Sequence, residues 1–168
     1  MAHSVRIFDG SSVMDRLLKD AKQLKGSYVK VGYPAGGKLG APSKKGSSHN
    51  PYQDVSELAT VAATHEYGAP KKNIPKRATI RPAIDKGKEK IGKLQAKLVD
   101  AVFAGKITIE QALDTLGEFL ISLIKKEIST LLLPPLSPKT IKRKKSSKPL
   151  IDMGQMRNSV NFTRHRAN

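Results

Sequence analysis

The chain has 168 residues, with 31 Lys and Arg against 14 Asp and Glu, and no cysteine or tryptophan. Without cysteine it can form no disulfide, thiolate metal site or thiol nucleophile, and its length predicts a single domain over 1–168. A formal net charge of +17 attracts polyanions, so we expect nucleic acid or an acidic protein surface as a neighbour.

The positive charge is spread unevenly along the chain. Residues 1–60 hold 9 basic and 5 acidic residues, 61–130 hold 13 and 8, and 131–168 hold 9 and 1. We therefore treat 131–168 as a basic C-terminal segment. Residues 1–9 lack the apolar run of a signal peptide, and no apolar run reaches the length of a membrane span. We expect a soluble protein with no membrane partner.

Apolar periodicity in the first third predicts a helix, a strand, a loop and a second helix. A helix over 11–25 follows a capping box formed by Ser12 and Asp15, and a strand over 28–33 alternates apolar and polar residues. Residues 34–54 are rich in Gly, Pro, Ser and Lys, which predicts a long flexible loop. The second helix covers 55–67, with Asp54 as its cap and Gly68 at its end.

The remainder predicts a helical hairpin and a closing strand. Residues 69–81 read as extended or turn-like, and Pro82 suits the first turn of a helix over 83–104. A second capping box, Thr108 with Gln111, begins a helix that ends near 129. A short helix over 137–144, a turn over 150–157 and a strand near 158–164 follow. We predict an α+β fold in which this strand pairs antiparallel with 28–33.

Two short motifs resemble parts of a phosphate-binding loop and of a zinc site, but both are incomplete. Residues 32–38 (GYPAGGK) match a phosphate-binding loop, but Leu39 supplies no hydroxyl for Mg²⁺. His65-Glu66 resembles half of a zinc-protease helix, and Ala69 occupies the position of the second histidine. We therefore predict no cofactor, no metal and no catalytic residue. An enzyme would need Asp152 or His65 to form a cleft with a second titratable group.

The basic clusters predict contact with DNA or with an acidic partner. Helix-turn-helix, zinc-finger and aromatic stacking patterns are missing, so any DNA contact should be sequence-independent. The candidate contact residues are Lys71, Lys72, Lys76, Lys142, Arg143, Lys144, Lys145 and Lys148.

Two groups of motifs together resemble one protein family. The first comprises residues 62–70 (AATHEYGAP), 74–78 (IPKRA) and 80–83 (IRPA), and the second comprises 136–144 (LSPKTIKRK) and 148–160 (KPLIDMGQMRNSV). Their order and spacing resemble the tail-completion and neck proteins of long-tailed bacteriophages, and the virion-morphogenesis proteins of Mu-like phages. Ala78 and Thr79 depart from the family's Pro-Phe, and Met153 and Met156 also differ.

The resemblance implies roles for particular residues. Residues expected to define the fold are His65, Glu66, Gly68, Pro75, Pro82, Asp152, Gly154 and Ser159. Asp152 is expected to cap the turn at 154–157 or to pair with Arg157. Residues expected to contact a neighbouring subunit or partner are Tyr67, Arg77, Arg81 and Arg157.

The resemblance also implies a function. The family's proteins are structural virion components that complete the tail or join head and tail, and they build rings, commonly of six subunits, around the DNA channel. The expected partners are further copies of the chain, the connector or adaptor, and tail tube or tail terminator proteins. The expected location is the virion neck, after assembly in the host cytoplasm. The alternative is a stand-alone, sequence-independent DNA-binding protein.

Overall fold

The computed structural model describes residues 10–35, 37–40, 52, 54–130, 134–144, 150 and 154–167. Its elements, in chain order, are α1 (Gly10–Gly26), β1 (Tyr28–Gly32), α2 (Val55–Tyr67), the 3₁₀ turn η1 (Pro70–Lys72), α3 (Ile80–Phe103), α4 (Ile109–Thr130), α5 (Pro138–Lys144), α6 (Gln155–Asn158) and β2 (Asn161–His165). Helices dominate and the described strands form one small antiparallel sheet, so the predicted α+β class is confirmed.

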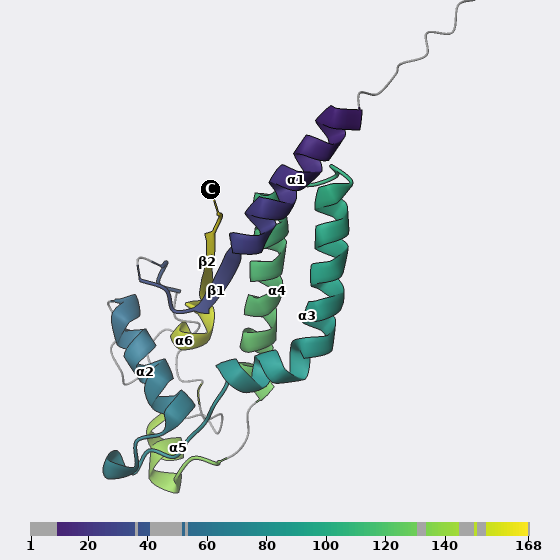
Figure 1. The fold of residues 1–168 in the computed structure, drawn as a ribbon. Helices are drawn as coiled ribbons and strands as arrows, with labels where there is room; N and C mark the ends of the chain where they lie inside the picture. Colours follow the sequence, from purple (N-terminus) through teal and green to yellow (C-terminus); the bar gives the residue numbers. More distant parts are fainter. Residues whose placement is uncertain are drawn as a thin grey trace, which may run out of the picture.

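The helical hairpin of α3 and α4 is the centre of the fold (Figure 1). Its turn contains Gly105 at φ +68° and ends in the predicted capping box. The Thr108 N–H donates to Gln111 Oε1 at 2.9 Å, and the Gln111 N–H donates to Thr108 Oγ1 at 3.2 Å. Two of the N–H groups that a helix start leaves without helical partners are thereby satisfied.

The sheet packs on α4 and joins the strand that follows α1 to the C-terminal strand. β1 pairs antiparallel with β2 in a register that runs from Tyr28 opposite His165 to Gly32 opposite Asn161. The Tyr28 and His165 rings stack with centroids 4.7 Å apart. The predicted pairing is confirmed. The strand β2 begins only at Asn161, because Ser159 still belongs to the end of α6, and β1 ends at Gly32.

Two hydrophobic clusters form the core, one at each end of α4. The larger cluster joins α2, the start of α3, the end of α4 and the segment around α6, and its buried members are Leu58, Ala83, Ile124, Ile128, Leu150, Met156 and Val160. The smaller cluster lies near the α3–α4 turn and contains Val102, Ile109, Ala112 and Leu113. Both candidate motif groups therefore contribute to the same, larger cluster.

Helix α1 differs from its prediction in two respects. It begins at Gly10, so Ser12 lies inside the first turn and the predicted capping box is wrong. Its apolar face is also largely uncovered, since Val13, Met14 and Leu18 are 40%, 57% and 53% exposed. In Figure 1 the helix crosses the hairpin near the α3–α4 turn, and its first turns extend past it. The apolar side of α1 is therefore only partly covered within the subunit.

The other predicted boundaries hold within a few residues. Asp54 caps α2, accepting hydrogen bonds from the Ser56 N–H at 3.3 Å and the Ser56 hydroxyl at 2.5 Å. Residues 69–81, predicted to be extended or turn-like, contain the turn η1, but α3 already begins at Ile80, earlier than predicted. In the described ranges no helix is both long enough and apolar enough to cross a bilayer.

Candidate functional site

The motif residues around position 66 build the junction between α2 and α3. Glu66 lies in the last turn of α2, and its carboxylate accepts three backbone hydrogen bonds from the first residues of α3. The donors are the N–H groups of Thr79 at 2.7 Å, Ile80 at 3.0 Å and Arg81 at 3.0 Å. A carboxylate at this position satisfies free N–H groups and complements the positive end of the helix dipole.

The environment of Glu66 lowers the pKa of its carboxyl group. Partial burial raises this pKa, but the three backbone donors and the charge of Arg81 together outweigh the burial. The carboxylate therefore stays ionised. The hydrogen bonds from Thr79, Ile80 and Arg81 to Glu66 also explain why α3 starts three residues earlier than its apolar pattern and Pro82 suggest.

Gly68 and Arg77 complete the junction. Gly68 has φ +80°, and a Cβ on it would lie 3.1 Å from the Lys76 backbone nitrogen, so both its conformation and its surroundings favour glycine. The Arg77 N–H donates to the His65 carbonyl at 2.7 Å. The chain after α2 thus folds back along the helix that precedes it.

Arg77, which was expected to contact a partner, is buried within the subunit. Its side chain is only 8% exposed, and the guanidinium donates to the carbonyls of Pro134 at 3.0 Å and Pro135 at 3.1 Å. These bonds hold the segment after α4 against the α2–α3 junction. Two donors of the guanidinium are thus used within this chain.

The second motif group contains α6 and the hydrogen bonds that hold it in place. Gly154 has φ +74° and begins the helix, and the Asn158 N–H donates to its carbonyl at 3.0 Å. The fully buried Ser159 hydroxyl donates to the Gln155 carbonyl at 2.8 Å and accepts from the Gly40 N–H at 2.7 Å. Ser159 therefore ties the turn of α6 to residues that follow β1.

Gln155 and Tyr33 add further hydrogen bonds to α6, and the sequence analysis did not identify either residue. The Gln155 side chain accepts from the Tyr52 N–H at 2.8 Å and donates to the Tyr52 carbonyl at 3.0 Å. The Tyr33 hydroxyl donates to the Met156 carbonyl at 3.0 Å, and burial raises the pKa of this hydroxyl. The described ends of the predicted loop 34–54 are thus bound to α6, over sequence separations that no local pattern reveals.

One side of the α2–α3 junction presents a surface hollow of about 360 Å³. Tyr67 is 70% exposed there, next to the exposed residues Lys76 and Arg81 and the ring of Pro82. Glu66, Ala78, Asp85 and Lys86 also line it. The hollow offers apolar contact beside cationic groups, and it contains two of the predicted partner-contact residues.

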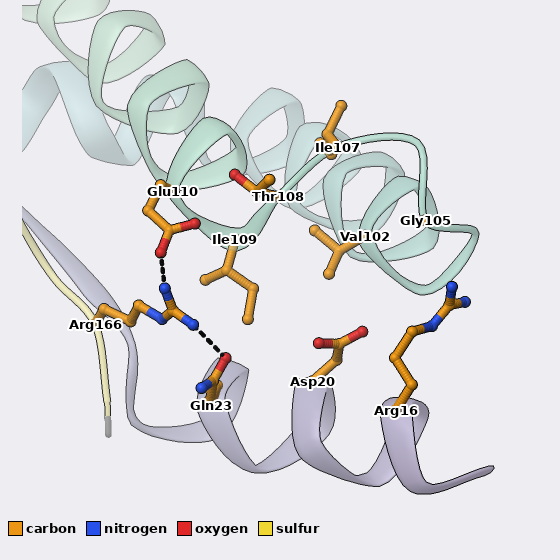
Figure 2. A pocket seen from close by; sticks show the side chains of 10 residues that line it. All are labelled: Arg16, Asp20, Gln23, Val102, Gly105, Ile107, Thr108, Ile109, Glu110 and Arg166. Atoms are coloured by element: carbon orange, nitrogen blue, oxygen red, sulfur yellow. Dashed lines mark hydrogen bonds and ion pairs between the residues drawn. The ribbon is translucent and has the colours of Figure 1, made fainter. Parts of the chain in front are cut away.

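A second hollow, of about 330 Å³, lies between α1, the α3–α4 turn and the end of β2. Figure 2 shows Arg166 reaching across it, with its guanidinium between Glu110 of α4 and Gln23 of α1. On the other side Arg16 donates to the Phe103 carbonyl at 3.1 Å. The C-terminal strand thereby fastens α1 to the hairpin through polar contacts.

Further contacts support this fastening. Arg164 pairs with Asp114 of α4, and the Ala167 N–H donates to the Ser27 hydroxyl at 3.2 Å. A hydrogen bond from its own backbone N–H, and the charge of Arg166, hold the pKa of Glu110 below its ordinary value. These ion pairs are half exposed, so each contributes little to stability by itself.

The remaining predicted residues have more scattered positions. Lys71, Lys72 and Pro75 are exposed near η1, Lys142 is exposed on α5, and Arg157 is half-buried with its Nε 3.4 Å from Asn158 Oδ1. Arg143 and Lys144 belong to α5. Asp152, Lys145 and Lys148 lie outside the described residues, so their predicted roles remain predictions.

The described residues contain no group of three or more His, Cys, Asp or Glu side chains that could hold a metal ion. Glu66 in one hollow caps α3 and Glu110 in the other pairs with Arg166, and the cationic and apolar groups around them can bind a complementary surface. Comparisons of the chain with protein-family models, with curated proteins and with solved structures found no match.

Proposed function

We propose that this chain is a structural subunit of a bacteriophage virion, which forms an oligomeric ring at the head–tail neck around the DNA channel. The observation that carries the proposal is a division of roles within one motif, in which some residues fix the backbone and others are exposed. Glu66, Gly68 and Arg77 fix the backbone of the α2–α3 junction, whereas Tyr67 and Arg81 project from that junction at the surface.

This division supports a binding function. A side chain that is 70% exposed and aromatic contributes little to its own fold, but Tyr and Arg are the residues that most often dominate protein–protein interfaces. The hollow beside Tyr67 gives such an interface a concave site. We propose a neighbouring copy of the chain as the occupant, with connector and tail proteins binding elsewhere on the ring.

Sedimentation velocity over a range of concentrations, together with electron microscopy of the same samples, tests the proposal. Wild-type protein should form ring-sized species, alone or with isolated tails or connectors. The double variant Tyr67→Ala/Arg81→Ala should weaken this assembly by at least about thirtyfold in Kd, the effect of a single interface hot spot.

A matched control removes an exposed apolar residue and an exposed basic residue elsewhere, Val99→Ala/Lys88→Ala on α3. It should assemble like the wild type. Wild-type protein that stays monomeric under every condition, with and without tails and connectors, would contradict the proposal.

A second candidate function is stand-alone, sequence-independent DNA binding. The net charge of +17 and the exposed lysines near η1 favour it. It requires free protein to retain duplex DNA with a steep salt dependence. Failure to retain duplex at low salt would eliminate it.

A further inference from the structure

Helix α3 carries a row of lysines on one side. Their spacing of four, three and four residues places them within an arc of about 60° on the helix surface. All of them are exposed. We call this row the lysine stripe, and it consists of Lys86, Lys90, Lys93 and Lys97.

The stripe lies apart from the face that α3 packs on α4. That packed face contains Ile84, Ile91 and Leu98, together with Gly87, where a Cβ would lie 2.5 Å from the Leu123 side chain. At 3.6 residues per turn the centre of the stripe is roughly 120° from the centre of this face. Packing of α3 on α4 therefore does not account for the positions of Lys90, Lys93 and Lys97, whereas Lys86 reaches α4 through Glu127.

Neighbouring carboxylates only partly neutralise the stripe. Lys86 pairs with Glu127 and Lys93 with Glu89, each at 2.6 Å, but the lysine side chains are 69% and 71% exposed. The Lys93–Glu89 pair is exposed on both sides and therefore weak, whereas Lys86 pairs with a Glu127 side chain that is only 12% exposed; each ammonium still has further donors. Within the part of the chain that the structure describes, Lys90 and Lys97 make no ion pair.

The geometry points to the phosphate backbone of duplex DNA as the ligand. Eleven residues of helix span about 16 Å, and a duplex presents a phosphate charge every 1.7 Å of axis, roughly ten over that length. Lysine ammonium groups act as point charges, without the fork that reads base edges. We propose that the stripe binds duplex DNA without sequence preference.

This inference builds on the DNA-channel part of the proposed function, and it also applies to the alternative. It assigns the DNA contact to α3, which forms one edge of the molecule in Figure 1. The lysines near η1 and on α5, which the sequence suggested for this contact, are not required by it.

Salt-dependent binding of a fluorescent 25-base-pair duplex to the full chain tests the inference. The variant Lys90→Gln/Lys97→Gln should reduce the slope of log K against log salt by about 1.8, the loss of two phosphate contacts. The control Lys19→Gln/Lys22→Gln removes the same charge from exposed positions on α1 and should leave the slope unchanged. Lys90→Arg/Lys97→Arg keeps the charge and should retain binding.

Several results would overturn the inference. One is an equal loss of slope in the stripe variant and its α1 control, which would make net charge the sole cause. Another is no binding of duplex by the wild type at low salt. A third is loss of polyglutamate binding in the stripe variant with duplex binding intact, which would make an acidic protein the ligand.

Sedimentation of the same variants separates the inference from the proposed function. Ring assembly that survives in the stripe variant, with DNA binding reduced, supports both. Wild-type protein that never assembles, but whose stripe binds duplex as expected, removes the neck proposal and leaves the inference standing.

Discussion

At the scale of single residues, Glu66 explains most about the first motif. Its two carboxylate oxygens accept from three successive backbone N–H groups of another helix, 13 to 15 residues further along the chain. Asp54 caps α2 through a residue two positions away, as caps usually do. Glu66 acts over a longer loop, and it fixes where α3 begins.

We predict that Glu66→Gln lowers the free energy of unfolding by about 1–2 kcal/mol at pH 7. An amide keeps one acceptor oxygen but removes the charge and points an NH₂ group at backbone donors. Urea denaturation measures the change. Glu118→Gln, at an exposed position on α4, is the control and should stay within about 0.5 kcal/mol of the wild type.

The same substitution should change the pH dependence of stability. The folded-state pKa of Glu66 lies below the ordinary value of 4.5, so the unfolded chain binds the proton more readily. The contribution of Glu66 is therefore present above about pH 4.5 and is lost as the pH falls through the folded-state pKa. The difference between wild type and Glu66→Gln should shrink towards pH 3; a constant difference would exclude the ionised cap.

At the scale of elements, two glycines of the helical hairpin have different surroundings: one is closely packed and the other faces open space. Gly117 of α4 faces the sheet, and a Cβ there would lie 2.4 Å from the Phe162 ring. Gly92 of α3 has no atom within 4 Å of such a Cβ. The sequence alone gives both the same appearance, a glycine inside an amphipathic helix.

We predict opposite effects of alanine at these two positions. Gly92→Ala should raise the free energy of unfolding by about 1 kcal/mol, through helix propensity alone. Gly117→Ala should lower it by about 1–3 kcal/mol, because the ring has to move within a packed interface. Thermal or urea denaturation of both variants checks this, and stabilisation by Gly117→Ala would show that β2 does not pack on α4 as described.

Local patterns were sufficient for most elements and insufficient for their junctions. The strand pair, the hairpin and the Thr108–Gln111 box follow from apolar period, turn residues and capping chemistry, all encoded within a few residues. The buried role of Arg77 and the fastening of α1 by Arg166 depend on partners 57 to 143 residues away. No periodicity encodes such distances, so these contacts required the structure.

The candidate site divides in the same way. The sequence identified Tyr67 and Arg81 through a resemblance to a family, and the structure places both at one hollow. The lysine stripe was visible in the sequence only as lysines on a helix. Its alignment and exposure became meaningful once the packed face of α3 was known, because that face defines which side remains for a ligand.

At the scale of the whole molecule, several features remain unused by the single chain. The apolar residues of α1 are uncovered near one end, Tyr67 is uncovered at the α2–α3 junction, and α3 carries the lysine stripe. A net charge of +17 opposes association of identical chains unless a polyanion is present. A ring that encloses DNA would supply both the copies and the polyanion.

Electron cryomicroscopy of the assembled phage particle tests the central claim most directly. The account predicts that this chain can be traced in a ring between head and tail, with Tyr67 and Arg81 in contact with a neighbouring subunit. Absence of the chain from purified particles, or its presence only outside the neck, would contradict the account.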